Sequence, residues 1–208
     1  MNSYRPIFIL GFFLSFTSCH AHDLADLQKA CPSIRMDIRY ASQKNFTGTV
    51  VYRNFTGRTY LLRHVTEALA DVQRELELHG LGLLVWDAYR PLPAQGVLWE
   101  LVKDPRYVAP PHKGGRHTRG TAVDCTLIDK RTNEPLEMPT AFDDFSEQAA
   151  ADYHGATGSA LRNRLLLRLI MEKHGFIPLL AEWWHFDYHD WQSHPPLEID
   201  FNQLHSEN

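Results

Sequence analysis

Two amphipathic segments, each with the periodicity of a helix, lie far apart in this chain. Strand-like segments lie between them, and this arrangement limits the folds that the chain can adopt. Apolar residues recur at three- and four-residue intervals over residues 61–80 and again over residues 159–174. This periodicity predicts two helices that each pack one face on a sheet, with Gly80 and Gly175 as their stops. In the second helix the expected apolar side consists of Leu161, Leu165, Leu166, Leu169 and Ile170.

A strand pattern and a breaker follow the first helix. The apolar run at residues 83–86 predicts a buried strand. Pro91 prevents its regular continuation, so we expect Arg90 at the end of this strand. A shorter helix is expected over residues 94–102, and a loop rich in proline and glycine over residues 104–115.

The remaining segments complete a pattern in which helices and strands do not alternate. The β-branched segment 121–128 predicts a strand, which the turn at 129–134 and the return at 135–138 extend into a hairpin. A final strand is expected over residues 183–188, whereas residues 34–57 have the turn signals of an irregular N-terminal lobe. We therefore predict an α+β fold with a mostly antiparallel central sheet and flanking helices.

Length and composition exclude several classes of protein. The 208 residues, of which 44% are hydrophobic, suffice for one sizeable core and predict a single domain. The net charge of −4 argues against a nucleic acid or an anionic membrane surface as partner. An aromatic content of 12% and the absence of low-complexity tracts exclude a disordered chain.

The first residues differ in composition from the rest and resemble a targeting segment. A positive charge precedes an apolar run at residues 7–16, and small residues follow up to Ala21, so residues 1–21 are predicted to be a secretory signal peptide. The run is too short to span a membrane, so no transmembrane span is expected in the mature domain, residues 22–208. Lipid attachment at Cys19 is the alternative to cleavage after Ala21. Both predict an exported protein, periplasmic or extracellular.

Two cysteines, Cys31 and Cys125, remain after removal of the targeting segment. They are too few for a cysteine zinc site, and the sequence has no CxxC motif. An oxidising compartment permits a disulfide, so the pair is either one bridge or two buried thiols. We hypothesise the bridge, because Cys125 directly follows Asp124 and a crosslink would steady that strand.

The chain contains twelve histidines, and most have unremarkable explanations. His64, His79 and His174 lie on or at the ends of the predicted helices, where solvated or capping roles are expected. His194 and His205 lie in a polar, proline-containing tail.

Two clusters of functional residue types stand apart from these histidines. Residues 114–124, GGRHTRGTAVD, contain His117 and Asp124, and residues 182–186, EWWHF, contain His185. Two imidazole nitrogens and one carboxylate oxygen leave a fourth tetrahedral position for water, which is the ligand count of a catalytic zinc site.

Glu182 is then free to act as the general base that takes a proton from zinc-bound water. The alternative is a structural one. A buried histidine would be hydrogen-bonded to Asp124, and Glu182 would belong to an unrelated ion pair.

The two clusters match the zinc motifs of a known superfamily. Residues 117–124 resemble the HxxGxAxD motif of the D,D-peptidase superfamily, which also contains D,D-carboxypeptidases and the hedgehog signalling domain. Residues 182–185 resemble its ExxH motif. Within the superfamily, the sequence is most similar to D-alanyl-D-alanine dipeptidases of the VanX type. Further matching segments run in the family order, namely NFTG at 45–48, WDAYRP at 86–91, FD at 142–143 and MEKHGF at 171–176.

The resemblance implies a D,D-peptidase-like fold and one zinc ion per chain, bound by His117, Asp124 and His185. It implies that Glu182 is the catalytic base and that the reaction is hydrolysis of D-Ala-D-Ala to two D-Ala. A small D,D-dipeptide is therefore the expected substrate.

The resemblance also assigns residues that would contact the substrate. Arg90 would stabilise the oxyanion of the tetrahedral intermediate, and Asp143 would pair with the free amino group of the dipeptide. Trp183 and Trp184 either wall the site or belong to the core. The family usually has serine where this chain has Gly115, which affects the dipeptide preference rather than the metal site.

Two other functions are compatible with a zinc site of this kind. A D,D-carboxypeptidase would act on longer cell-wall peptides, and a non-catalytic zinc domain would bind only peptidoglycan or a partner. Glu182 and Arg90 argue against the second rival, because binding alone requires neither a base nor an oxyanion partner.

Overall fold

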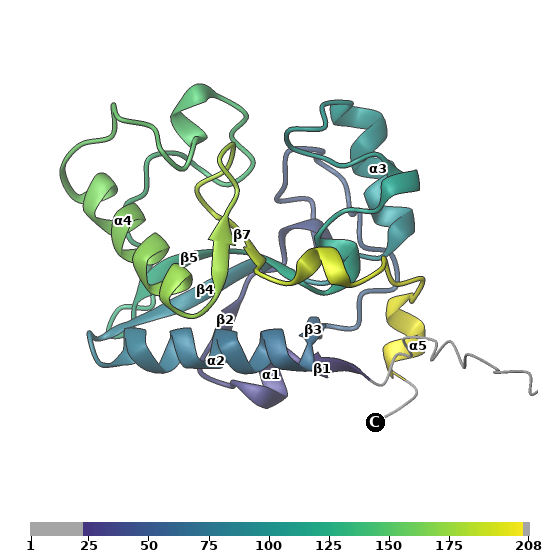
Figure 1. Ribbon diagram of the computed structural model, residues 1–208, viewed down its shortest axis with the longest axis horizontal. Helices are drawn as coiled ribbons and strands as arrows, with labels where there is room; N and C mark the ends of the chain where they lie inside the picture. Colours follow the sequence, from purple (N-terminus) through teal and green to yellow (C-terminus); the bar gives the residue numbers. More distant parts are fainter. Residues whose placement is uncertain (1–22, 206–208) are drawn as a thin grey trace, which may run out of the picture.

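A five-stranded sheet lies at the centre of the structure, a computed structural model that describes residues 23–205 (Figure 1). Its strand order is β2-β4-β5-β7-β6, with β2 parallel to β4 and every other neighbouring pair antiparallel. The strands are β2 (Arg35–Met36), β4 (Leu81–Asp87), β5 (Ala122–Asp129), β6 (Phe176–Pro178) and β7 (His185–Tyr188). The α+β fold with a mostly antiparallel sheet is thus confirmed.

Two long helices, α2 (Arg63–Glu77) and α4 (Gly158–Lys173), pack on this sheet and on each other (Figure 1). Helix α2 contacts β4, and α4 contacts β5 and β6. The apolar stripe of α2 is fully buried and consists of Val65, Leu69, Val72 and Leu76. Burial of each such side chain contributes roughly 1.5–3 kcal/mol, so this contact is a main source of the fold's stability.

The first helix starts later than its periodicity predicted. Leu61 and Leu62 belong to β3 (Tyr60–Leu62), which pairs antiparallel with β1 (Leu24–Asp26) in a separate two-stranded sheet. The amide of Leu62 also donates to the carbonyl of Gly120, so tertiary pairing overrides the helical pattern here. The helix stop is correct, because Gly80 adopts a φ of +70°.

The predicted apolar side of α4 was wrong in part. Leu165 and Leu169 are 48% and 64% exposed, although both were expected to face the core. The helix instead buries Ala160, Arg164, Leu167, Ile170 and Met171. A count of leucines misplaced the stripe because Arg164 lies within it, where its guanidinium donates to the carbonyl of Ala150 at 3.2 Å.

The segments on either side of α2 follow the predicted order. Helix α3 (Leu92–Val102) begins directly after Pro91, and residues 34–57 contain only β2 and the 3-10 turn η2. The other short elements are α1 (Leu27–Ala30), η2 (Arg39–Ala41), η3 (Pro111–Lys113), η4 (His117–Arg119), η5 (Glu147–Ala149), η6 (Trp191–Ser193) and α5 (Phe201–His205).

The hairpin expected after β5 forms its turn and one bridge, but no second strand. The Asn133 amide donates to the Asp129 carbonyl at 2.7 Å, but the returning chain makes a single bridge between Ile128 and Pro135. The Asp129 and Leu136 amides donate to the Glu134 and Leu127 carbonyls at 3.0 and 2.9 Å, so Pro135 occupies the non-hydrogen-bonded position of this bridge and needs no amide hydrogen there.

The hypothesised disulfide is not formed. Cys31 and Cys125 are both free, buried thiols. Cys31 lies at the end of α1, which packs on β1 and α2, and its sulfur is 3.7 Å from the Ser33 hydroxyl. Cys125 is fully enclosed within β5, so each thiol is accommodated as a small core side chain.

The predicted signal peptide, residues 1–21 with Cys19, lies outside the described residues. Across residues 23–205, no helix combines the length and the apolar character needed to cross a bilayer.

Candidate active site

A pocket lies where the end of β4 meets the beginnings of β5 and β7. The space between its lining residues is about 490 Å³, open solvent at its mouth included. Its polar lining consists of Tyr40, Arg90, Gln95, Tyr107, Arg116, His117, Asp124, Asp143, Glu182 and His185. Every predicted site residue is therefore in this one pocket.

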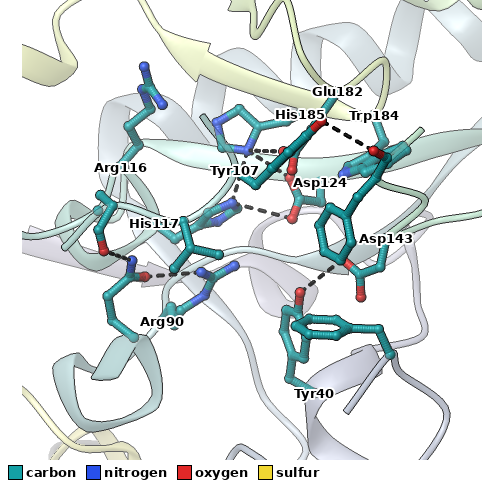
Figure 2. Close-up of a pocket in the computed structure, with 16 residues that line it drawn as sticks. Tyr40, Arg90, Tyr107, Arg116, His117, Asp124, Asp143, Glu182, Trp184 and His185 are labelled. Carbon is teal, nitrogen blue, oxygen red and sulfur yellow. Dashed lines mark hydrogen bonds and ion pairs between the residues drawn. The ribbon is translucent and has the colours of Figure 1, made fainter. Parts of the chain in front are cut away.

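Two imidazoles and one carboxylate converge in the pocket (Figure 2). Nε2 of His117 lies 3.1 Å from Nδ1 of His185 and 3.3 Å from Oδ2 of Asp124. Nδ1 of His185 lies 2.9 Å from Oδ1 of Asp124. Ligand atoms of a tetrahedral zinc ion with bonds of 2.0–2.1 Å are about 3.3 Å apart, so the donor set fits this metal.

The register between neighbouring strands sets the positions of two proposed ligands, Asp124 and His185, and of a third residue, Asp87. Asp124 of β5 is paired with His185 of β7 on one side and with Asp87 of β4 on the other. A bulge between Val85 and Asp87 brings Asp87 into this row. The three side chains therefore follow from backbone pairing across three neighbouring strands.

The outer nitrogen of each imidazole faces an acceptor. Nδ1 of His117 lies 2.8 Å from the Ala88 carbonyl oxygen, and Nε2 of His185 lies 2.9 Å from Oδ1 of Asp187. These acceptors favour the tautomers that carry hydrogen on the outer nitrogen and direct a lone pair into the site. Asp187 also forms an ion pair with Arg116 at 2.7 Å.

Charges around the converging atoms favour a cation between them. Burial lowers the pKa of His185, but Asp187 and Asp124 raise it to about 10. Burial raises the pKa of Asp124, yet His117 and His185 bring it well below its usual range. A metal cation supplies the positive charge that these carboxylates otherwise obtain from a proton.

A tight turn presents His117 to the site. Turn η4 ends at Gly120, whose φ of +69° is in the left-handed region. A Cβ atom there would lie 2.9 Å from Leu24 Cδ2 and 3.2 Å from the Leu62 nitrogen, so only glycine fits. The amide of Arg90 donates to the His117 carbonyl at 3.2 Å and joins this turn to the end of β4.

Glu182 lies on the β6–β7 loop beside the converging ligand atoms (Figure 2). Its carboxylate is 3.8 Å from Nδ1 of His185, and its side chain is 9% exposed. Burial raises the pKa of Glu182 to about 8. A carboxyl group with this pKa can both accept and donate a proton near neutral pH.

Arg90 points into the pocket from the end of β4, where the sequence placed it. Its Nε and Nη2 atoms donate to Oδ2 of Asp87 at 3.1 and 2.7 Å, and its Nη1 atom donates to Gln95 Oε1 at 3.0 Å. Although burial lowers the pKa of Arg90, Asp87 raises it well above its usual value. The guanidinium is therefore charged and fixed.

Asp143 contributes a carboxylate from a different loop. Tyr40 donates to its Oδ1 at 3.0 Å, whereas its Oδ2 is buried without a hydrogen-bond partner. Burial is the main reason that the pKa of Asp143 is raised to about 7. Its φ of +60° is sparsely populated for a non-glycine residue, and strain of this kind is often found at functional sites.

The two tryptophans have different positions. Both belong to the core, but only Trp184 also lines the pocket, whereas the indole of Trp183 donates to the Thr140 hydroxyl at 2.8 Å. Gly115 also lines the pocket, and a Cβ atom there would lie 3.0 Å from Oε1 of Gln95. A serine at this position would therefore press on the side chain that holds Arg90.

Sequence reasoning missed the residues that hold the predicted ones in place. The sequence contained a signal for Asp87, because this residue stands three residues before Arg90 at the end of a predicted strand. Asp187 had one as well, because it lies two residues after His185 and so on the same face of the strand. Tyr40 reaches the pocket from a distant segment and Gln95 from the start of α3, and no local pattern marks either residue.

With this geometry in view, the chain can be compared with known proteins. A family profile described as D-ala-D-ala dipeptidase matches residues 20–207. The chain belongs to this D-Ala-D-Ala dipeptidase family of peptidases. It is 38% identical over 180 residues to the D-alanyl-D-alanine dipeptidase of Escherichia coli K12, covering 86% of this chain and 92% of the relative. The D-alanyl-D-alanine dipeptidase of Enterococcus faecium is 30% identical and covers 84% and 95%.

Two solved structures resemble this member of the dipeptidase family. The LdcB LD-carboxypeptidase aligns with a TM-score of 0.47 and 16% identity, covering 89% of this chain and 78% of its own. The D,D-pentapeptidase VanY, solved in complex with Zn(II), aligns with a TM-score of 0.41 and 13% identity, covering 73% and 87%.

Proposed function

We propose that this chain hydrolyses the dipeptide D-Ala-D-Ala to two molecules of D-Ala and uses one zinc ion held by His117, Asp124 and His185. The observation that carries the proposal is the convergence in one pocket of these ligand side chains with Glu182 and Arg90. Binding alone would need neither the additional carboxylate nor the fixed guanidinium. Membership of the dipeptidase family supports the same reaction class.

The proposed metal ligands match a catalytic rather than a structural site, because three protein ligands leave one coordination position open. When bound, zinc lowers the pKa of a coordinated water and polarises a carbonyl oxygen. The acceptors at Ala88 and Asp187 hold the two imidazoles in the orientation that presents a lone pair.

Glu182 is the proposed general base. It stands beside His185 but is not one of the three converging ligand atoms, so it is free to take a proton from the attacking water. Its pKa, about 8 among protein groups alone, falls when a cation is bound nearby, which keeps the carboxylate ionised near neutral pH. After the amide bond breaks, the same group can protonate the leaving amine.

Arg90 is the proposed partner of the negative charge that develops on the carbonyl oxygen. Asp87 and Gln95 fix its guanidinium in the pocket before substrate arrives. A donor that needs no reorganisation during the reaction stabilises a transition state more than it stabilises the substrate.

Asp143 is the proposed determinant of dipeptide selectivity. Its Oδ2 atom is buried and unpaired, and the ammonium of a free dipeptide would supply both the missing hydrogen bond and the opposite charge. A peptide with a blocked amino group would leave this carboxylate unpaired at a cost of roughly 1–3 kcal/mol. Longer cell-wall peptides are therefore expected to be poor substrates.

The proposal is tested by comparing three substrates of the purified mature protein. The value of kcat/KM is measured for D-Ala-D-Ala, for its N-acetyl form and for a stem pentapeptide ending in D-Ala-D-Ala. We expect efficient cleavage of the free dipeptide only, loss of turnover with a chelator, and recovery on addition of zinc. Efficient release of terminal D-Ala from the pentapeptide would instead identify a carboxypeptidase, and binding without hydrolysis would identify a non-catalytic domain.

We also propose that the protein is exported after cleavage behind Ala21. The composition of residues 1–21 supports this proposal. N-terminal sequencing and intact mass of the protein recovered from cells test it. Cleavage after Ala21 leaves His22 as the first residue, whereas lipidation leaves a modified Cys19 and an unprocessed chain begins at Met1.

A further inference from the structure

A second group of potential metal ligands lies outside the pocket. His64 stands on the first turn of α2, and Asp190 and His194 flank the turn η6. Nε2 of His64 lies 3.1 Å from Oδ2 of Asp190, and Nε2 of His194 lies 3.0 Å from the same oxygen. The structure thus joins two histidines for which the sequence predicted unrelated, incidental roles.

The donor atoms of this group have unmet capacity for bonding. Oδ1 of Asp190 is shielded from solvent and makes no hydrogen bond, and Nε2 of His64 has only its ion-pair contact with Oδ2 of Asp190. One ligand atom from each residue lies within 4.8 Å of the others, and the two imidazole rings stack with centroids 5.3 Å apart. Tetrahedral ligand atoms are about 3.3 Å apart, which both histidine–Asp190 distances already approach.

We propose that His64, Asp190 and His194 form a second site for a divalent cation of the borderline class, such as Zn²⁺, Ni²⁺ or Cu²⁺. Two imidazoles and one carboxylate suit these ions, whereas Mg²⁺ and Ca²⁺ prefer oxygen ligands. A bound cation would give a partner to the unpaired Oδ1 of Asp190. The three side chains are 22–37% exposed, so water can complete the coordination.

The position of the cluster points to a structural role. The segment that contains it braces the turn that carries His117, because Trp191 lies under the guanidinium of Arg116 at 5.0 Å. Arg119 donates to the carbonyl of His194, and the amide of Leu197 donates to the carbonyl of Thr118 at 2.8 Å. A metal that ties this segment to α2 would stabilise the turn from outside the pocket.

The competing explanation is an ion pair without metal, in which Asp190 binds protonated imidazoles. Bound zinc per chain distinguishes the two and is measured by equilibrium dialysis of tag-free mature protein against saturating Zn²⁺. We expect two equivalents for the wild type and one each for His64→Ala and His194→Ala. His79→Ala is the matched control in the turn that follows the same helix, since His79 is exposed, and it should retain two.

A change in folding does not make this test ambiguous. His64→Gln keeps a polar side chain of similar size, and circular dichroism reports whether each variant is folded. A wild type that binds no more than one equivalent overturns the proposal, as does a folded His64→Gln protein that still binds two.

The test also separates this site from the proposed active site. His117→Ala should bind one zinc and lose turnover, whereas His64→Ala should bind one zinc at the active site. If the zinc retained by His117→Ala disappears in the His64→Ala/His117→Ala double variant, the second site is established independently of the proposed function.

Discussion

At the scale of single residues, Arg90 illustrates how the pocket fixes a charge. Its guanidinium makes two hydrogen bonds to Asp87 and one to Gln95, and it lies over the ring of Tyr40 at 5.2 Å. A lysine would carry the same charge but could not make these planar contacts together.

We therefore expect Arg90→Lys to recover little of the activity lost in Arg90→Ala. Loss of an oxyanion donor lowers kcat by about 10²–10³-fold, and both variants should fall in this range. Steady-state kinetics with D-Ala-D-Ala measures this effect. Near wild-type kcat in Arg90→Lys would show that charge alone is sufficient.

Glu182→Gln separates metal binding from proton transfer. The variant keeps the shape of the side chain but removes the base, so bound zinc should be unchanged while kcat falls at least 10²–10⁴-fold. Glu67→Gln on the exposed side of α2 is the control and should be fully active. If Glu182→Gln loses zinc as well, Glu182 is a ligand rather than a base.

Ionisation of Asp143 should produce an acidic limb in the pH profile of kcat/KM. Burial raises its pKa to about 7, so the carboxylate that pairs with an ammonium predominates only above this pH. The value of kcat/KM for the dipeptide should accordingly rise with pH on a limb at or below about 7, since bound zinc lowers this pKa further, and the limb should disappear in Asp143→Asn. Persistence of the same limb in that variant would assign the titration to another group.

At the scale of elements, the turn before β5 is the position where backbone conformation decides the site. Gly120→Ala places a Cβ atom against Leu24 and the Leu62 backbone at a φ of +69°. We expect a loss of roughly 1–3 kcal/mol in the free energy of unfolding, measured by urea titration. Gly96→Ala in α3 is the matched comparison, because its added Cβ meets no atom within 4 Å.

Gly96→Ala should stabilise the protein by about 0.5–1 kcal/mol, since alanine is favoured over glycine in a helix interior. If the two substitutions change the free energy of unfolding in opposite directions, the effect at Gly120 arises from its backbone conformation and not from the loss of glycine as such.

The elements also show what could be predicted from the sequence. The strand at 83–86, the helix at 159–174 and the two zinc-motif clusters have strong local patterns, and the structure has elements at these places. Pairing of Leu61 with β1 and burial of Arg164 depend on contacts with distant segments, which periodicity does not contain. The same holds for Tyr40 at the pocket.

At the scale of the whole molecule, metal binding should stabilise the fold. His117 comes from a turn, and Asp124 and His185 come from neighbouring strands, so one ion would join segments far apart in sequence. At a free zinc concentration 100 times Kd, binding raises the free energy of unfolding by about 2.7 kcal/mol, which corresponds to an increase of several degrees in Tm. Removal of zinc should therefore lower Tm, as differential scanning calorimetry can measure.

His117→Ala should show a smaller difference in Tm between zinc-containing and chelator-containing buffer. Equal differences in the two proteins would place all of the stabilising metal outside the pocket.

The row of Asp87, Asp124 and His185 across three strands has a consequence for how such enzymes diversify. Sheet hydrogen bonds fix the spacing within this row, whereas Tyr40 reaches the pocket from the short turn η2 and Asp143 from a loop. Loops tolerate insertion and replacement far better than paired strands do. Exchange of these loops should therefore change which substrate fits the pocket while leaving the spacing of the strand-borne side chains unaltered.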